Sequence, residues 1–333
     1  MLDISQLKEK YPQAVTKLSE LAISASSPAL TPGNFGSVSV KLDKQTMLIK
    51  KQGSRLAGFD IDKHAATVNF RQLRDFFLDH QPLEIKEGIQ KTYTELLESA
   101  SSNQPDELAG AHSLLGKYVL HSYSFLVNLA CACEQGIGII TRCFLDAEFE
   151  WLWIPYNKQS GKIAFMIKEA QRQHRERREA EPQVFFLQNN GILISGDSPQ
   201  EILAIQEDIH ARLNKRFKMT VEDFPETQLS SKRRPPYTSD NMWLRQALTA
   251  DDLTEYWQNP TFLIEERLQA LIAPEKMPTV NEGEDVLSFS LPRGEAIEQE
   301  ELLTYSLFCK EKFGPLRLRR LTLKDAPPDF VGR

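Results

Sequence analysis

The sequence is poor in cysteine, in long apolar runs and in any excess of positive charge. Only 4 of its 333 residues are cysteine, too few for the disulfide framework of a secreted protein. Uninterrupted apolar runs stay well short of the roughly 18 residues that a membrane-spanning helix needs. Lysine and arginine number 40 against 46 aspartate and glutamate, a net charge of −6, which disfavours a broad nucleic-acid surface because phosphate contacts need clustered cations.

Several motifs that carry chemistry are also missing. There is no glycine-rich dinucleotide fingerprint, no P-loop, no His-Glu-x-x-His and no Gly-x-Ser-x-Gly elbow. The first residues, 1–5, lack the basic-then-apolar pattern of a signal peptide. We therefore expect a cytoplasmic protein from a reducing compartment, with neither a membrane nor a nucleic acid as partner.

What is present is an ordinary globular balance, with 41% hydrophobic and 26% charged residues. Apolar residues at helical spacing predict a helix over 2–24. After a turn-rich stretch, the sequence predicts two short strands, 37–42 and 46–50. Later apolar segments alternate without strict strand–helix–strand order, which favours an α/β (α+β) fold with a mixed sheet between helices. Other expected elements are strands at 118–121, 151–154, 184–187 and 192–194, and helices at 125–133, 161–181, after Pro199 and at 296–312.

The domain organisation is read from composition. A proline-rich and basic stretch near 228–238 is typical of a linker. The sequence therefore predicts a main domain over 1–227, a linker over 228–238 and an α+β extension over 239–333 that packs on the main domain.

Two of the six histidines have positions that suggest a function. His112 and His121 flank a helix-to-strand corner, and His121 ends the strand. Strand ends often carry functional groups, but a buried, hydrogen-bonded structural histidine is an equally good interpretation of His121 and a better one of His112. His174 and His210 lie on charged helix faces and are expected to be plain surface residues.

Four stretches, in register over about 10–225, resemble motifs of the class II aldolase/adducin family. The likeness is greatest to its longer type, the aldolase part of rhamnulose-phosphate aldolase/dehydrogenase fusions. The matched stretches are the glycine-rich phosphate turn at 33–42, the second phosphate loop at 49–56, the His-x-His segment at 112–133, and the Ile-Pro-Tyr and Asn-His-Gly…Ser-Gly-Asp signatures at 153–156 and 187–197.

The resemblance implies a three-layer αβα fold with a largely antiparallel central sheet. It also implies a chemistry, the reversible cleavage of a sugar phosphate to dihydroxyacetone phosphate and an aldehyde. In this family three histidines hold a zinc ion that stabilises the enediolate as a Lewis acid. A glutamate moves the proton, and loop backbone N–H groups cradle the phosphate.

When the family's site residues are matched to this sequence one by one, most of them are absent. The first metal histidine matches His121, but the second falls on Tyr123 and the third on Asn190. The acid/base glutamate falls on Leu108, and the serine of the adjoining phosphate motif falls on Asp106. The predicted site residues are therefore His121, Tyr123, Asn190, Leu108 and His112 in the pocket, with Gly36, Ser37, Gly53 and Ser54 as the phosphate-loop equivalents.

Three functions remain open on this basis. The first is a binding or assembly role without catalysis, for which the head domain of adducin is the family precedent. The second is a metal-independent lyase or isomerase in which His121 and Tyr123 act as acid and base. The third is a zinc aldolase whose ligands lie elsewhere in the sequence. We expect no cofactor, with zinc only in the third case, and a homo-oligomer, dimer or tetramer.

Overall fold

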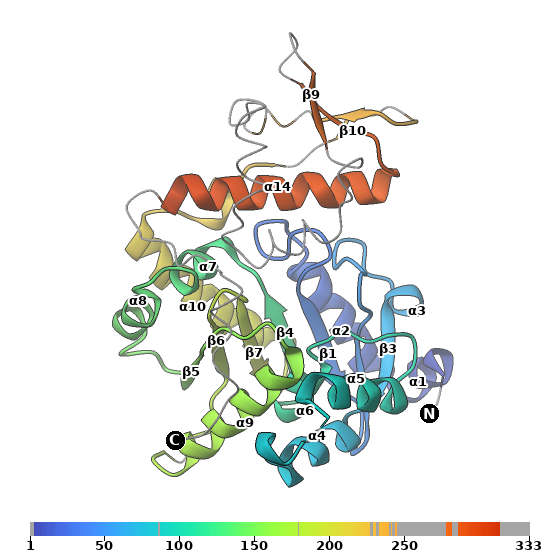
Figure 1. Cartoon of the computed structure of the whole chain (residues 1–333), viewed down its shortest axis with the longest axis vertical. Helices are drawn as coiled ribbons and strands as arrows, with labels where there is room; N and C mark the ends of the chain where they lie inside the picture. Colours follow the sequence, from blue (N-terminus) through green and yellow to red (C-terminus); the bar gives the residue numbers. More distant parts are fainter. Residues whose placement is uncertain are drawn as a thin grey trace.

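The central feature of the molecule is one mixed sheet. The computed structural model describes residues 3–85, 87–178, 180–226, 229–230, 233–239, 241, 244, 278–281 and 286–313. Within this part, seven strands form a sheet in the order β3-β2-β1-β4-β7-β6-β5 (Figure 1). They are β1 Ser37–Lys41, β2 Thr46–Lys50, β3 Ala65–Asn69, β4 Tyr118–Ser122, β5 Trp151–Ile154, β6 Val184–Leu187 and β7 Ile192–Gly196. Only the β5–β6 pair is parallel, so the predicted mixed, largely antiparallel sheet is confirmed.

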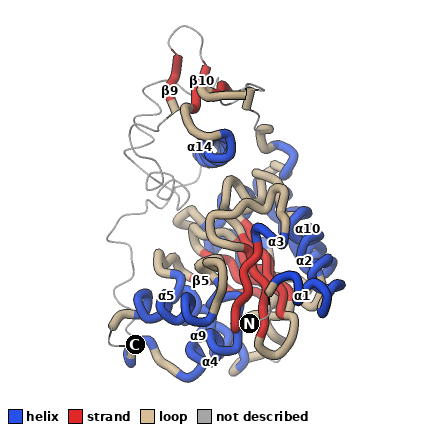
Figure 2. The backbone as a smooth tube through the Cα atoms, turned by 90° about the vertical axis from the view of Figure 1, so that its right-hand side faces the viewer, coloured by secondary structure: helices blue, strands red, loops and turns tan. Residues whose placement is uncertain are grey.

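Helices cover both faces of this sheet, as Figure 2 shows. One face packs against α2 Pro12–Ser24, α7 Phe125–Cys131, α8 Gly136–Cys143 and α10 Pro199–Phe217. The other packs against α4 Phe70–Asp79, α5 Ile89–Ala100, α6 Ala109–Leu114 and α9 Ser160–Arg175. Apolar clusters fill the space on each side of the sheet, which gives the expected three layers.

Helix boundaries differ from the sequence expectation in two places. The predicted helix over 2–24 is two helices, α1 Ile4–Lys10 and α2, separated at Tyr11. Pro12 cannot donate the backbone hydrogen bond that a continuous helix would need, but it suits the first turn of a new one. The predicted helix over 161–181 ends at Arg175, before the run of charged residues is complete.

The described residues of the C-terminal part form a second, three-stranded sheet and one long helix. The strands are β8 Tyr237–Thr238, β9 Thr279–Asn281 and β10 Val286–Phe289, in the order β8-β10-β9. Because β8 is part of a sheet, the last two residues of the predicted linker 228–238 are not linker. The remaining elements among the described residues are α3 Ile61–His64, two 3₁₀ turns at Pro82–Glu84 and Val221–Asp223, and α14 Arg293–Phe313.

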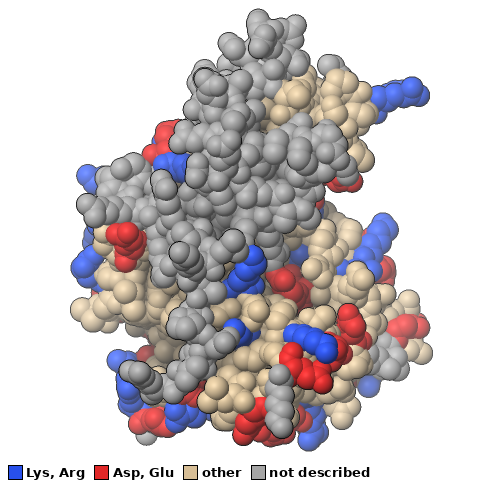
Figure 3. Space-filling model, viewed as in Figure 1, with Lys and Arg blue, Asp and Glu red and all other residues tan. Residues whose placement is uncertain are grey.

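Helix α14 lies across one end of the main sheet domain, close to α7 (Figure 1). Much of the predicted extension 239–333, including 245–277 and 314–333, lies outside the described residues. On the face shown in Figure 3, the described basic and acidic side chains are interspersed rather than gathered by sign. None of the described helices combines the length and apolarity that crossing a membrane requires.

Candidate functional site

His121 lies near the end of β4, in the middle of the sheet. Its neighbours across the two antiparallel ladders are Ser37 on β1 and Leu193 on β7. The chain leaves the sheet just after this point, and Tyr123 follows with its ring centroid 4.7 Å from the centroid of the His121 ring. The sequence prediction that these two side chains lie together is consistent with this geometry.

Asn190 joins His121 and Tyr123 into one hydrogen-bonded cluster. The His121 Nε2 donates to the backbone carbonyl of Asn190 at 2.8 Å, and the Tyr123 hydroxyl donates to the Asn190 side-chain oxygen Oδ1. A carbonyl oxygen can only accept, so the proton of the neutral imidazole sits on Nε2. His121, Tyr123 and Asn190 are only 3%, 2% and 5% exposed, so the cluster is closed to solvent.

The turn that presents Asn190 depends on glycine. Asn189 and Gly191 both have positive φ, 57° and 73°, and a Cβ on Gly191 would lie 2.2 Å from the carbonyl oxygen of Ser122. The Gly191 N–H donates to Asn128 Oδ1 on α7 at 3.1 Å. The turn is therefore held against the end of β4 at a distance that only glycine permits.

Burial keeps the cluster uncharged. Desolvation lowers the pKa of His121, although its hydrogen bond to Asn190 and the charge of Asp106 oppose the shift. Desolvation also raises the pKa of Tyr123 well above its ordinary value. A neutral imidazole and a neutral phenol are poor partners for proton transfer at pH 7, because each resists its charged form.

His112 belongs to a separate arrangement. Its Nε2 lies 3.0 Å from the Ser37 hydroxyl and its Nδ1 lies 2.7 Å from the Ser39 hydroxyl. The ring is fully buried, and desolvation lowers its pKa to about 3. With both ring nitrogens partnered, His112 fits the structural interpretation and connects α6 to β1.

The position of the family's acid/base residue is apolar. Leu108 is 4% exposed and packs with Ala111, Leu115 and Val119 on the face that carries α6 and α9. Its side chain has no proton to give or take. The geometry thus offers no replacement for the missing glutamate at this position.

The two predicted phosphate loops adjoin a buried lysine that the sequence reasoning missed. Lys50, at the end of β2, donates to the carbonyl oxygens of Asn34 at 2.9 Å and Ser54 at 2.7 Å. Its ammonium lies 3.9 Å from Asp106. The lysine therefore connects the first loop to the second. Its place directly after the apolar run of a predicted strand is the sequence signal that could have identified it.

Gly36 and Gly53 differ in how tightly they are held. Both have positive φ, 76° and 74°. A Cβ on Gly36 would lie 2.5 Å from Thr31 Cγ2, whereas a Cβ on Gly53 would meet nothing within 4 Å. Ser37 is fully buried beside His112, so its hydroxyl serves the fold and is not offered to a ligand.

The side chains that the sequence resemblance aligns with zinc ligands, those of His121, Tyr123 and Asn190, are a poor set for zinc. They supply one imidazole already bonded through Nε2, one phenol with a raised pKa and one amide. Zinc prefers imidazole, thiolate and carboxylate ligands. In the part of the chain that the structure describes, no group of three His, Cys, Asp or Glu side chains is placed to hold a metal ion.

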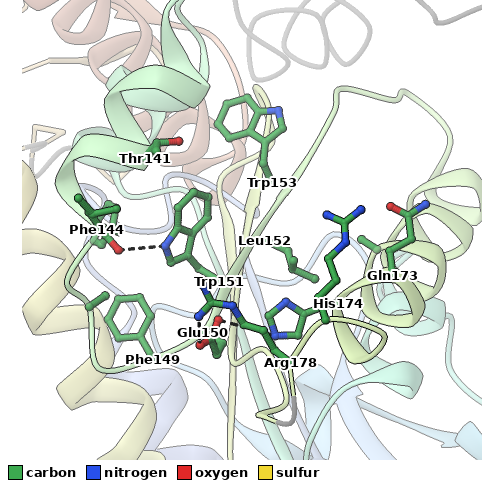
Figure 4. Close-up of a pocket in the computed structure, with 14 residues that line it drawn as sticks. Thr141, Phe144, Phe149, Glu150, Trp151, Leu152, Trp153, Gln173, His174 and Arg178 are labelled. Carbon is green, nitrogen blue, oxygen red and sulfur yellow. Dashed lines mark hydrogen bonds and ion pairs between the residues drawn. The ribbon is translucent and has the colours of Figure 1, made fainter.

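An open pocket lies elsewhere, between α8, β5 and α9 (Figure 4). It has a volume of about 530 Å³ and is lined in part by Trp151, Trp153 and His174. Two of its charged groups pair with each other, since Arg178 Nη1 lies 2.7 Å from the Glu150 carboxylate. None of the predicted site residues lines this pocket.

Comparisons with known proteins return structures but no sequence families. No family model matches the chain, and no curated protein matches it. The N-terminal class II aldolase domain of a conserved protein from Thermoplasma acidophilum aligns with 16% identity over 60% of this chain and 92% of that one, at a TM-score of 0.49.

Two further aligned structures are named as sugar-phosphate aldolases. A sugar-phosphate aldolase from Thermotoga maritima has 11% identity over 61% of this chain and 94% of that one, with a TM-score of 0.40. An L-fuculose 1-phosphate aldolase from Glaciozyma antarctica PI12 has 10% identity over 66% and 78%, also with a TM-score of 0.40. At these low scores, the fold description rests on the strand order and register given above.

Proposed function

We propose that this chain is a protein of the class II aldolase/adducin type that has lost zinc-dependent sugar-phosphate cleavage and acts by binding. The motif order along the sequence supports the family, and the hydrogen-bonded cluster supports the loss of the reaction. The observation that carries the proposal is the Asn190 pairing. Asn190 engages both the His121 Nε2–H and the Tyr123 hydroxyl, which are the two donors that a substrate at this position would need.

The competing proposal of a metal-independent lyase or isomerase is weaker. It requires His121 and Tyr123 to exchange protons with a substrate. Both side chains are buried, and burial moves the pKa of each away from neutrality, downward for His121 and upward for Tyr123. An acid–base pair for catalysis near pH 7 has pKa values close to that pH.

The proposal is tested by assaying release of dihydroxyacetone phosphate from a panel of ketose 1-phosphates, with and without added zinc. We expect no release above a heat-treated control. A parallel thermal-shift screen of small metabolites is expected to find stabilising ligands, because a ligand that binds the folded state raises its melting temperature. Zinc-dependent release that is lost in His121→Ala contradicts the proposal.

A further inference from the structure

The main sheet ends in a strand whose outer edge has no partner strand among the described residues. This strand is β5, which pairs with β6 alone. The open pocket of Figure 4 lies along that edge, with α8 and the loop after it on one side and α9 and the residues after it on the other. The pocket is therefore a groove whose floor is the edge of a sheet.

The pairing with β6 determines which backbone groups of β5 face this groove. The Glu150 carbonyl accepts a hydrogen bond from the first residue of β6 at 3.2 Å, and the Ile154 carbonyl accepts one from the residue after β6 at 2.9 Å. Alternate residues of a strand direct their backbone groups to the same side, so Trp151 and Trp153 direct theirs away from β6. Within the described residues, these N–H and C=O groups have no hydrogen-bond partner. They are the groups to which an added strand bonds.

The wall on the α8 side is aromatic and apolar. The Trp151 Nε1 donates to the Phe144 carbonyl at 3.1 Å. A Cβ on Gly136 would lie 3.0 Å from Trp153 Cη2, so this indole packs closely on the start of α8. Leu145, which also lines the groove, is 84% exposed. This wall therefore offers two fixed indoles and an uncovered leucine to an apolar side chain.

The wall on the α9 side carries the charge. The side chain of His174, expected from the sequence to be a plain surface residue, is only 9% exposed, and its Nε2 lies 3.0 Å from the Ala180 carbonyl. Arg178 is paired with Glu150. Arg177 forms no ion pair and no side-chain hydrogen bond within the described residues. One guanidinium on this wall is thus left without a counter-charge, which favours an acidic partner.

We propose that this groove binds an extended peptide segment of a partner protein, which adds to the sheet as a further strand along β5. Side chains alternate between the two faces of a strand, so the segment places apolar residues against the tryptophan wall and acidic residues against Arg177. Its sequence is therefore an alternation of apolar and acidic residues. The inference goes beyond the proposed function, because it names a surface and a partner class and uses no residue of the His121 cluster.

A partner segment fits this edge better than a second copy of β5 does. In strand addition the backbone bonds supply affinity, and the side chains on the two faces supply specificity. The four residues of β5, Trp151–Ile154, are all apolar. A second copy of this strand would therefore present no carboxylate to Arg177 from within the strand.

The test follows binding at the tryptophans of the full chain. The four tryptophans are isotope-labelled at nitrogen, and their backbone and indole N–H signals are recorded by NMR during titration with acetyl-Glu-Phe-Glu-Val-Glu-amide. Trp151→Phe and Trp153→Phe assign the signals. The comparison peptide is acetyl-Lys-Phe-Lys-Val-Lys-amide. Two N-methylated forms of the acidic peptide, one methylated at Phe and Val and one at the three Glu residues, test the backbone bonds.

Two pairs of variants separate the walls. Arg177→Gln removes the unpaired charge, and Arg172→Gln is its control, at an exposed position of α9 that does not line the groove. Leu145→Asp places a carboxylate on the apolar wall. Leu83→Asp is its control, because Leu83 is also well exposed, at 70%, and lies outside the groove.

We expect the acidic peptide to shift the backbone N–H signals of Trp151 and Trp153 and to bind more tightly than the basic peptide. Arg177→Gln should weaken its binding about threefold, as for an exposed ion pair. Leu145→Asp should weaken it about tenfold, because an apolar contact is lost. Both control variants should bind as the unmodified chain does.

The methylated peptides should differ from one another. Only alternate residues of an added strand direct their N–H groups at β5. One methylated form should therefore lose binding, and the other should keep it.

Four results would overturn the inference. The first is an absence of shifts at Trp151 and Trp153, or slow exchange of their amides in the free chain, which would mean that the edge is already covered. The second is equal affinity for the acidic and basic peptides, and the third is the same effect from both methylated forms. The fourth is a dependence of these signals on protein concentration without peptide, which would assign the edge to a second copy.

These readouts are independent of zinc and of His121. Zinc-dependent aldol activity would refute the proposed loss of catalysis and leave the result at β5 unchanged. A failure of the acidic peptide to bind would refute the strand-addition site and leave the zinc and metabolite tests of the proposed function unchanged.

Discussion

At the scale of single residues, burial and pairing decide what the site can do. His112, His121, Tyr123 and Asn190 are all closed to solvent. Their polar atoms are directed at one another or at nearby serines and backbone. Buried polar groups are costly unless they are bonded, so each of these residues contributes to stability as a member of a network.

The buried His112 should make the protein lose stability in mild acid. Its pKa is lowered to about 3 in the folded state, against about 6.5 when unfolded. Below pH 6.5 the unfolded chain therefore binds more protons, and stability falls as the pH falls. This histidine alone should remove roughly 2 kcal/mol between pH 7 and pH 5.

Urea unfolding at several pH values checks this expectation. His112→Gln keeps a side-chain partner for one of the two serines and removes the titrating group. Its stability should depend less on pH than that of the unmodified chain over the same interval. Parallel curves for the two proteins would show that His112 does not titrate differently on unfolding.

Gly191 should be far less tolerant of a side chain than Gly53. Both have positive φ, which costs an alanine about 1–2 kcal/mol. A Cβ on Gly191 also meets the Ser122 carbonyl at 2.2 Å, whereas Gly53 has open space. We expect Gly191→Ala to destabilise by at least about 3 kcal/mol and Gly53→Ala by only about 1 kcal/mol, as measured by denaturant unfolding. Equal costs would mean that the turn is not held as described.

At the scale of elements, α14 is coupled to the candidate site as well as to the turn at Gly33, which precedes β1. The Tyr305 hydroxyl donates to the backbone carbonyl of Tyr123 and accepts from Asn128 Nδ2 at 2.7 Å. Asn128 in turn accepts from Gly191. A chain of hydrogen bonds thus runs from α14 through α7 to the turn that presents Asn190.

A double-mutant cycle should detect this chain. Asn128→Ala and Tyr305→Phe each remove one partner, and the pair should show a coupling energy of about 1 kcal/mol in equilibrium unfolding. Tyr93→Phe is the control. Its hydroxyl bonds Glu107 and Gly110 on the opposite face of the sheet, so its effect should add to that of Asn128→Ala. If the effects of Asn128→Ala and Tyr305→Phe on stability simply add, α14 is not energetically coupled to the site.

The elements also show what the sequence could predict. Short apolar runs bounded by turn residues predict six of the seven strands of the main sheet, but not β3 Ala65–Asn69. The break at Tyr11 was missed because the apolar spacing continues across Pro12. The family motifs singled out His121, Tyr123 and Asn190. In the structure these residues lie together, with Tyr123 just beyond the end of β4.

The partners that come from distant parts of the chain were not foreseen. Glu301 bonds the Gly33 N–H, 268 residues earlier in the sequence. Tyr305 bonds the Tyr123 carbonyl, 182 residues earlier. Nothing in the local pattern of α14 indicates which carboxylate will be buried. Pairing of this kind depends on the tertiary docking of the helix, which local propensity does not encode.

At the scale of the whole molecule, we propose that the chain assembles into a dimer or tetramer, as members of the class II aldolase/adducin family that its sequence resembles commonly do. Light scattering at tens of micromolar should give a multiple of the 38.0 kDa chain mass. A mass of one chain would contradict this expectation.

We propose that Tyr123 and Asn190 have replaced a metal site by a hydrogen-bonded cluster around His121. The decisive measurement is zinc titration followed by calorimetry, on the unmodified chain and on Tyr123→His/Asn190→His. The unmodified chain should hold well under one zinc per chain, and the double variant should bind zinc at least about tenfold more tightly, because three imidazoles then converge. Stoichiometric zinc in the unmodified chain, lost in His121→Ala, would contradict the claim.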